Sequence, residues 1–573
     1  MQNLKPDDVF EIIDTLYQSQ QARMTYGMSP AVLQDDLFSW GNHLLSSPGK
    51  MLKLAFYPVV NGAKFFKRMM SEAGPGEGKD QRFKSEDWKM LPWRLYAENF
   101  LFLEDWCHEA TSGIPGLDDK VERAVAFQAR QVLDAAAPMN FPATNPDIVK
   151  ETINTGGMNW VKGFQNALED MQRKASGKQP VGTEGFEVGK ALAATPGKVV
   201  LRTRLMELIQ YSPRTDVVCK EPVLIIPAWI MKYYILDLSP KNSLVKWLLE
   251  QGHTVFMISW KNPDAEDRDM GLDDYFRLGA MAAIDAVSSI VPNTKIHLTG
   301  YCLGGTLALI TAAAMAGNGD DRLKTLTLLA AQGDFTEAGE ITLFLREGQI
   351  KYLEKMMWAQ GYLDSGQMAG AFKMLRSYEL LWSKMVNDYL LGQRSKMIDL
   401  MVWNADATRM PYKMHSEYLE KLFLHNDFAE GRLTIEGKPV APGNIKVPVF
   451  AVGTEKDHVV PWPSAYKIHL MVNGSVTFVL TNSGHNAGIV SEPGHRGRYY
   501  RIHERKPGDA YLNPAHWLAS SELNQSKSWW SAWENWVAGY SSPGRVQPPS
   551  IMGTADGSYQ PVCDAPGTYV FQK

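Results

Sequence analysis

Short apolar runs recur along the chain beyond about residue 200, and turn residues bound each of them. Several are followed by a segment in which apolar positions have helical spacing. Continuous rather than alternating apolar runs indicate strands buried on both faces, as in a parallel sheet covered by helices. The runs occupy residues 222–230, 254–260, 295–300, 323–331, 447–457 and 476–485. We therefore predict an α/β catalytic domain over residues 201–573.

The first 200 residues have a different pattern. Residues 8–24 and 95–110 show the three- and four-residue spacing of amphipathic helices. Glycine-rich, charged stretches at residues 71–81 and 175–190 are typical of connectors. Because no catalytic signature occurs here, we expect residues 1–200 to form a mostly helical domain without catalytic residues.

A long interval separates the fourth predicted strand from the fifth. Residues 335–444 are rich in Met, Trp, Leu and Tyr at helical spacing. An insertion of this size between two strands of one sheet would lie over the strand ends. We therefore expect a cap over residues 335–444.

Composition limits the classes of function. The 573-residue chain has a net charge of -4, which gives no electrostatic reason to expect a nucleic-acid partner. Its four cysteines lack C-x-x-C spacing, so neither a zinc site nor a disulfide framework is expected, and a reducing compartment fits. No apolar run approaches the roughly 18 residues of a membrane span, and the first residues lack the apolar segment of a secretory signal. We expect a cytoplasmic protein.

The run at residues 295–300 leads into a turn with candidate chemistry. Gly300, Gly304 and Gly305 surround Cys302, and a helix of small residues should follow. A strand, Gly-x-Cys-x-Gly and a helix form the pattern of a nucleophile elbow, with a thiol where a hydrolase would carry serine. The helix N-terminus would stabilise a thiolate there. The alternative is a buried structural cysteine in a glycine-rich turn; we predict a nucleophile.

Two later strand ends supply an acid and a base in the order that α/β-hydrolases use. Asp457 ends the fifth run and His485 ends the sixth. Because the carboxyl ends of parallel strands meet at one crevice, we expect both side chains near Cys302, with His485 as general base and Asp457 orienting it. Asp334 also follows a strand and is the competing acid, but Asp457 fits the order of elements better.

Other polar residues have simpler interpretations. His458 should point away from the crevice if Asp457 faces it, and Glu455 is expected to be a solvated loop charge. His253 and His297 lie within or beside strands and are most simply packed.

An oxyanion hole needs two N–H donors. Leu303, directly after the nucleophile, would supply one, and the loop after the first run, around Ala228 or Trp229, would supply the other. The alternative for this loop is an ordinary strand end with aromatic side chains packed behind it.

A thiol in place of serine indicates acyl transfer. A thiolate exchanges one thioester for another near balance and leaves the acyl group reactive toward an alcohol or an amine. If the cap excludes water, an acyl-cysteine survives until an acceptor hydroxyl arrives. Cysteine hydrolases such as dienelactone hydrolases share this arrangement, so hydrolysis stays open as an alternative.

These motifs resemble those of the polyhydroxyalkanoate synthases of the single-subunit, class I-like type. The elbow Gly-Tyr-Cys-Leu-Gly-Gly is similar to that family's G-x-C-x-G-G box, and a 40-residue block starting at residue 225 is similar to a stretch specific to that family. The resemblance covers roughly residues 199–570, and the N-terminal 200 residues are more loosely similar. Residues 227–234 and 332–336 depart from the family's usual P-P-x-I-N-K-[YF]-Y and T-D-F-S runs.

The resemblance implies an α/β-hydrolase fold and a polymerase that takes (R)-3-hydroxyacyl-coenzyme A, releases coenzyme A and grows a polyester at a granule surface. It implies an acyl intermediate on Cys302, with His485 as base and with Asp457 acting either on His485 or directly on the incoming hydroxyl. It also implies that residues 1–200 contact a granule, a second copy of the chain or another partner. It also implies a homodimer whose cap gates the cysteine, with no metal and no bound cofactor. The alternatives are a thioesterase or depolymerase that hydrolyses 3-hydroxyacyl esters, and a non-catalytic granule protein.

Overall fold

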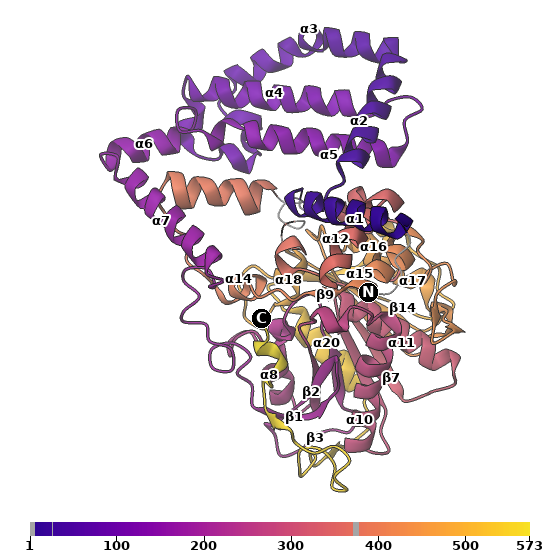
Figure 1. Cartoon of the computed structure of the whole chain (residues 1–573). Helices are drawn as coiled ribbons and strands as arrows, with labels where there is room; N and C mark the ends of the chain where they lie inside the picture. Colours follow the sequence, from indigo (N-terminus) through magenta and orange to yellow (C-terminus); the bar gives the residue numbers. More distant parts are fainter. Residues whose placement is uncertain (1–5, 26, 369, 371–376) are drawn as a thin grey trace. The chain divides into compact units, whose positions relative to one another are not determined.

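The computed structural model describes residues 6–25, 27–368, 370 and 377–573, which divide into two compact units (Figure 1). We call them the α/β unit, made of Thr183–Gln367, Met397–Lys573 and the N-terminal residues up to Gln20, and the helical unit, made of Gln21–Gly182 and Met368–Lys396. The helical unit thus includes a piece of the segment 335–444 that we expected to be the cap. Sequence position alone does not show this, because packing rather than chain order assigns a helix to a unit.

An 11-stranded sheet forms the centre of the α/β unit, in the order β15-β14-β13-β12-β7-β6-β4-β5-β2-β1-β17. Its six middle strands, from β13 to β5, are parallel, and the strands on either side of them are antiparallel. The parallel strands are β4 (Val223–Ile226), β5 (Val255–Trp260), β6 (Ile296–Tyr301), β7 (Leu323–Leu329), β12 (Val449–Thr454) and β13 (Val476–Thr481). The antiparallel strands are β1 (Gly197–Arg202), β2 (Met206–Tyr211), β14 (Tyr499–Arg505), β15 (Glu522–Gln525) and β17 (Cys563–Asp564).

All six predicted apolar runs are confirmed as the parallel strands. Every residue of β4, β5, β6, β12 and β13 is buried. Strands covered by helices on both faces cannot carry solvated side chains, which is why their sequences do not alternate.

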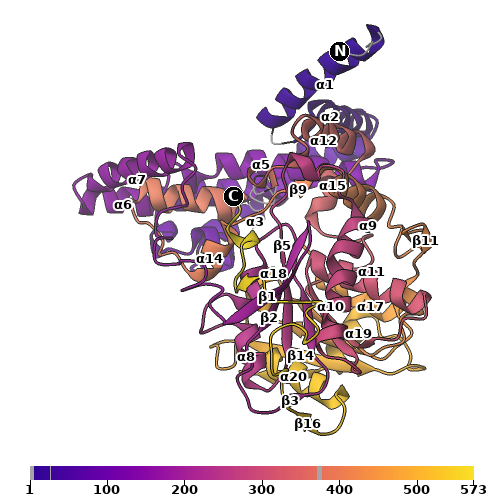
Figure 2. The same cartoon turned by 60° about the horizontal axis from the view of Figure 1, so that its bottom comes forward.

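Helices pack against this sheet (Figure 2). Helix α11 (Leu303–Gly317) is buried at every position from Leu303 to Met315, as expected for a helix that is apolar on all sides. Helices α8 (Leu244–Glu250) and α20 (Trp529–Tyr540) pack on each other, with the rings of Trp247 and Trp530 5.8 Å apart. Buried side chains of these helices therefore cover the sheet.

The longest helical segments of the expected cap among the described residues of the α/β unit follow one another along the chain. They are α12 (Glu347–Gln360), α14 (Asp399–Asn404), α15 (Tyr412–Glu417) and its continuation η11 (Tyr418–Leu424). The ring of Phe423 lies 4.7 Å from that of Phe335, just after β7, and 5.0 Å from that of Tyr418. These aromatic contacts bring η11 to the end of a parallel strand. The part of the cap at residues 369 and 371–376 lies outside the described residues.

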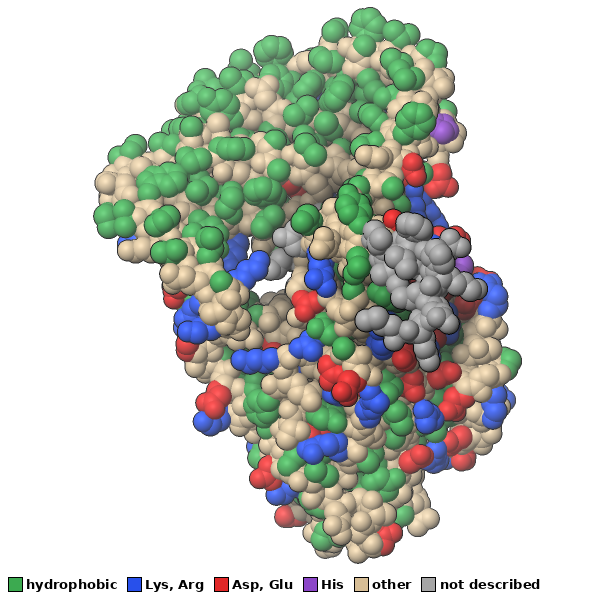
Figure 3. Space-filling view, viewed as in Figure 1, with side chains coloured by type: hydrophobic (Ala, Val, Ile, Leu, Met, Phe, Trp, Pro, Cys, Tyr) green, Lys and Arg blue, Asp and Glu red, His purple; other side chains and the backbone are tan. Residues whose placement is uncertain are grey.

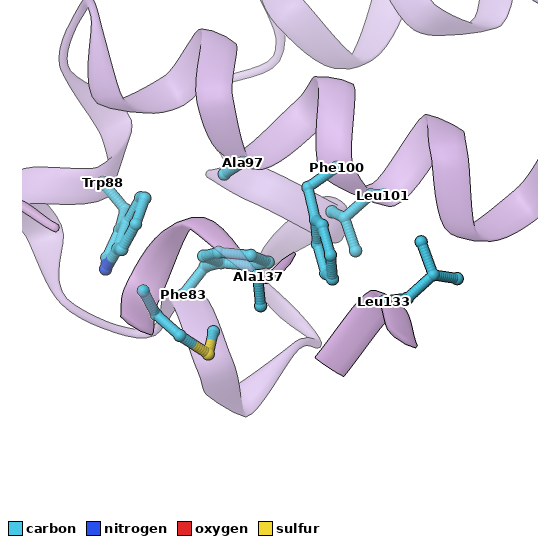
Figure 4. Close-up of a cluster of buried hydrophobic side chains, with 8 residues drawn as sticks. Phe83, Trp88, Ala97, Phe100, Leu101, Leu133 and Ala137 are labelled. Carbon is cyan, nitrogen blue, oxygen red and sulfur yellow. The ribbon is translucent and has the colours of Figure 1, made fainter. Parts of the chain in front are cut away.

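The helical unit is built from long helices, and its own core is a cluster of buried apolar side chains (Figure 4). Its helices are α2 (Pro30–Leu45), α3 (Pro48–Met70), α4 (Trp93–Thr111), α5 (Asp119–Ala136), α6 (Pro146–Asn154) and α7 (Met158–Ala175). In the core, Phe83 meets Trp88 edge-on with 4.9 Å between ring centroids. The helices predicted over residues 8–24 and 95–110 are confirmed as α1 (Pro6–Met24) and part of α4.

The helical unit also leaves many apolar side chains in solvent, visible as green atoms in Figure 3. Helix α3 alone exposes Leu52, Phe56, Val59, Val60, Phe66 and Met70. Exposed apolar patches of this extent mark interaction surfaces. Within the described ranges, no helix is both long enough and apolar enough to cross a membrane.

Candidate active site

Cys302 lies between β6 and α11 with φ 52° and ψ -123°, a backbone conformation that side-chain-bearing residues rarely adopt. The neighbouring glycines make this turn possible. A Cβ at Gly304 would lie 2.1 Å from the Ile226 carbonyl oxygen, and one at Gly305 would lie 2.4 Å from the Ala331 Cβ. The predicted elbow is therefore confirmed as a strained, glycine-dependent turn that begins a buried helix.

His485 and Asp457 form the hydrogen bond that the sequence predicts. His485 Nδ1 lies 2.7 Å from Asp457 Oδ2, and both side chains are buried. Asp457 Oδ2 also accepts from the Thr454 hydroxyl at 2.8 Å, while Oδ1 accepts from the N–H groups of Val459 and Val460, each at 2.9 Å. Burial raises the pKa of Asp457, but the charge of His485 and these hydrogen bonds outweigh it and lower the pKa overall. The carboxylate is thus held ionised.

The imidazole of His485 is electrostatically coupled to Cys302. Burial lowers the pKa of His485, but the negative charges of Asp457 and Cys302, together with hydrogen bonding to both, raise it well above its ordinary value. No nitrogen or oxygen of the described residues is a hydrogen-bond partner of His485 Nε2. The structure thus brings Cys302, His485 and Asp457 together, with Nε2 left for the thiol.

The competing acid lies elsewhere. Asp334 accepts hydrogen bonds from the N–H and hydroxyl of Thr336, at 2.9 and 2.5 Å, and lies 3.5 Å from Lys467 Nζ. It makes a local turn rather than a contact with His485. Glu455 differs from the expected solvated charge, because it accepts from the hydroxyl of Tyr499, the first residue of β14, at 2.7 Å.

Contacts from residues 403–408 fix the loop that would hold the second oxyanion donor. Thr408 donates from its hydroxyl to the Trp229 carbonyl at 2.6 Å and from its N–H to the Ile230 carbonyl at 3.2 Å. The Trp403 indole donates to the Lys232 carbonyl at 2.7 Å. With its carbonyls bound in this way, the loop has a defined conformation.

The N–H groups of Leu303, Ala228 and Trp229 donate no hydrogen bond to other described residues. Gly304, next to Leu303, packs directly on the backbone that precedes Ala228, which brings the elbow and the loop together. Their N–H groups are thus available for an oxyanion.

A second chain of contacts joins the elbow to the histidine loop. The Tyr301 hydroxyl donates to Asn486 Oδ1 at 2.5 Å, and Asn486 Nδ2 donates to Asn404 Oδ1 at 3.2 Å. The Tyr301 ring lies 5.7 Å from that of His485. Sequence analysis missed these partners, although Tyr301 and Asn486 each adjoin a predicted site residue.

Tyr418, on η11 of the expected cap, is a further site residue that sequence analysis missed. Burial and the charge of Cys302 raise its pKa well above the ordinary range, which places the phenol in the electrostatic field of the thiol. No local pattern could have indicated this electrostatic interaction, since it depends on how the cap packs.

The described residues contain no cluster of three or more His, Cys, Asp or Glu side chains arranged for a metal ion. The site is therefore built from a thiol, an imidazole, a carboxylate and backbone N–H groups. This set suits acyl transfer through a covalent thioester.

Comparison with known proteins shows the family to which the chain belongs. Residues 8–50 and 79–248 match two families described as "Poly-beta-hydroxybutyrate polymerase N terminal" and "Poly-beta-hydroxybutyrate polymerase (PhaC) N-terminus", and residues 221–492 match the alpha/beta hydrolase fold, which confirms the predicted fold. The poly(3-hydroxyalkanoate) polymerase of Methylorubrum extorquens is 41% identical over 499 residues, covering 86% of this chain and 81% of that protein. Poly(3-hydroxyalkanoate) polymerase 1 of Ectopseudomonas oleovorans is 30% identical over 574 residues, covering 97% and 98%. The chain belongs to the poly(3-hydroxyalkanoate) polymerase family.

Proposed function

We propose that the protein polymerises (R)-3-hydroxyacyl-coenzyme A into a polyester, with release of coenzyme A, through an acyl intermediate on Cys302. The observation that carries the proposal is the thiol on a strained elbow beside the buried His485–Asp457 pair. A hydrolase gains little from a thiol, whereas a transferase keeps the acyl group as a reactive thioester. The relatives named above carry the same activity in their names.

In the first half-reaction, His485 Nε2 takes the proton of Cys302, and the thiolate attacks the thioester carbonyl. The oxyanion that forms accepts hydrogen bonds from the N–H of Leu303 and from that of Ala228 or Trp229. Collapse of this intermediate expels coenzyme A as a thiolate, which takes the proton from the imidazolium. The acyl group is then bound to sulfur as a new thioester.

In the second half-reaction, His485 Nε2 takes the proton of an incoming hydroxyl. The oxygen attacks the acyl-cysteine carbonyl, an ester bond forms, and the Cys302 thiolate leaves and recovers the proton. Each cycle lengthens the polyester by one unit and restores the free thiol. Water in place of the hydroxyl would give hydrolysis, which the same residues could perform.

Asp457 acts through His485 in this proposal, rather than directly on the incoming hydroxyl. A carboxylate has about four acceptor positions. Two N–H groups, the Thr454 hydroxyl and His485 Nδ1 occupy four positions on Asp457. No position is left for a substrate hydroxyl, so Asp457 orients the imidazole and favours its cationic form.

The test supplies the purified protein with 3-hydroxybutyryl-coenzyme A, and then with a longer-chain homologue, and measures coenzyme A release and product mass. We expect high-mass polyester and coenzyme A from the wild type, neither from Cys302→Ala, and both from the matched thiol variant Cys563→Ala. Coenzyme A release with only free hydroxy acid would establish the hydrolase instead. No dependence on Cys302 would overturn the covalent route.

We also propose that the exposed apolar side chains of the helical unit hold the enzyme on the surface of its product. Val59 and Val60 on α3 are 76% and 75% exposed. Contact of such apolar side chains with water is unfavourable, and an aliphatic polyester would cover them. Val59→Glu should lower the fraction bound to polyester particles, whereas Lys64→Gln on the same helix should not. Equal binding by both variants would refute this surface.

A homodimer is the oligomeric state that we propose, in line with the family resemblance. Sedimentation of the full-length chain without substrate, compared with the mass of one chain, tests it. A species of monomer mass at all concentrations would contradict it.

A further inference from the structure

A second thiol lies at the opposite end of the sheet from Cys302. Cys219 ends strand β3 (Val218–Cys219) shortly before β4 begins, whereas Cys302 follows the last residue of β6. Strands β4 and β6 are parallel neighbours, so one thiol precedes the sheet and the other follows it. The proposed polymerase function makes no use of Cys219.

Cys219 is surrounded by groups that form a reactive thiol site rather than an apolar packing position. Its N–H donates to the Gly252 carbonyl at 2.8 Å, which brings the thiol beside His253. Across the strand pair, Cys219 lies opposite Arg545 of β16 (Arg545–Val546), whose guanidinium donates to the Gln251 and Gly252 carbonyls at 3.0 and 3.2 Å. A cation and an imidazole therefore flank one sulfur atom.

The third member of the cluster is a carboxylate. His253 is fully buried, and its Nε2 lies 3.4 Å from Glu534 Oε1 on α20. Its Nδ1 is buried and makes no hydrogen bond of ordinary geometry with the described residues. A buried imidazole nitrogen without a hydrogen-bond partner lowers the stability of the fold, unless a neighbour such as the thiol shares a proton with it.

Electrostatic interactions favour the Cys219 thiolate together with the His253 imidazolium. Burial raises the pKa of Cys219, but hydrogen bonding to His253 and the charges of His253 and Arg545 outweigh it and lower the pKa overall, against a smaller opposing effect of Glu534. Burial lowers the pKa of His253, but Cys219 and Glu534 outweigh it and raise the pKa. By contrast, burial raises the pKa of Cys107 and of Cys563. These two thiols are therefore internal controls.

We propose that Cys219, His253 and Glu534 form a second reactive thiol site, separate from the catalytic centre, at which small hydroperoxides modify the sulfur. The Cys219 thiolate attacks the outer peroxide oxygen, the O–O bond breaks, and the leaving oxygen takes the proton of the His253 imidazolium. The sulfur is oxidised to a sulfenic acid, and the hydroperoxide is reduced to an alcohol, or to water when it is hydrogen peroxide. Cys219 is only 6% exposed, so the site admits small oxidants and excludes bulky ones.

The test exposes the wild-type, full-length protein to hydrogen peroxide for a set time and then removes the peroxide with catalase. The chain is next unfolded in dimedone, so that the trap reaches a buried sulfenic acid, and each thiol is followed by peptide mass spectrometry. The four cysteines fall in four separate tryptic peptides, so each rate is read independently. We expect Cys219 to be labelled about tenfold faster than Cys107 and Cys563 near neutral pH, because a lowered pKa enlarges the thiolate fraction of Cys219 while raised pKa values reduce that of the two controls. Labelling of Cys219 no faster than that of these two thiols would overturn the proposal without any substitution.

A matched variant tests the role of the imidazole. His253→Gln should slow labelling of Cys219 about tenfold and leave the rates at Cys107 and Cys563 unchanged, provided that circular dichroism shows a folded chain. A general loosening of the structure would speed all thiols instead, and unchanged labelling of Cys219 would refute the assignment. Because the peptides report each sulfur separately, the result does not depend on whether Cys302 supports polymerisation.

Discussion

The substitution Asp457→Asn tests the catalytic reasoning most directly. The amide oxygen can still accept from the N–H groups of Val459 and Val460, so the loop should keep its conformation. The amide nitrogen would then face His485 Nδ1 and donate to it. This forces the imidazole proton onto Nε2, which is the nitrogen that must accept the proton of Cys302.

The expected loss follows from the contact between Asp457 and His485. A hydrogen bond to a charged group contributes about 1.5–3 kcal/mol net. Its loss lowers the pKa of His485, because the neighbouring anion that favours the imidazolium is gone. The wrong tautomer removes the general base as well, which is worth about 10²–10⁴ in rate. We expect a loss of acyl transfer in that range.

The assay is coenzyme A release in a single turnover, measured with a thiol reagent across a range of pH. Asp334→Asn is the matched control, because Asp334 also follows a strand but bonds to Thr336 and Lys467. It should stay near the wild-type rate. A near-normal rate for Asp457→Asn, or an equal loss for Asp334→Asn, would refute the assignment of the acid.

Three further predictions test the fold around the site. Gly304→Ala would place a Cβ 2.1 Å from a backbone carbonyl and should cost about 3 kcal/mol or more of unfolding free energy in urea, whereas Gly539→Ala on α20, with no atom within 4 Å, should gain about 0.5–1 kcal/mol. Burial raises the pKa of Asp237 to about 6, so its protonated form contributes stability that is fully present below about pH 4 and is lost as the pH rises through about 6. Asp237→Asn should therefore remove a pH dependence of about 2–3 kcal/mol, and identical pH profiles of wild type and variant would contradict this. Thr408→Val deprives the Trp229 carbonyl of its donor and should lower the rate of coenzyme A release more than it raises KM, because the oxyanion loop loses its support; a change in KM alone would speak against that role.

Local sequence was enough to predict the central sheet and the three residues at its edge. A strand buried on both faces is mostly apolar, so β4, β6 and β12 can be predicted from their own sequences. The elbow can be predicted from the sequence, because a strained turn with close backbone contacts requires glycine at fixed positions around Cys302. Asp457 and His485 followed from the geometry of parallel strands, whose carboxyl ends share one edge.

The antiparallel edges of the sheet were not predicted. More than half of the side chains of strand β14 are charged or polar, so its sequence does not indicate a buried strand. It forms a strand because it pairs with β13. Strand β2 is fully buried, yet its sequence was not among the predicted runs. Pairing with a neighbour, rather than local pattern, decides such strands.

Only the tertiary structure determines what surrounds the nucleophile. Thr408 reaches the Trp229 loop, Asn486 joins Tyr301 to Asn404, and Tyr418 enters the field of Cys302. These partners are far apart in sequence, and their contacts depend on how the cap and the loops pack. Sequence periodicity reports which face of an element is buried, but it carries no information about which distant element covers that face. The sequence by itself thus determined the sheet and the catalytic order, and packing decided the environment in which that chemistry takes place.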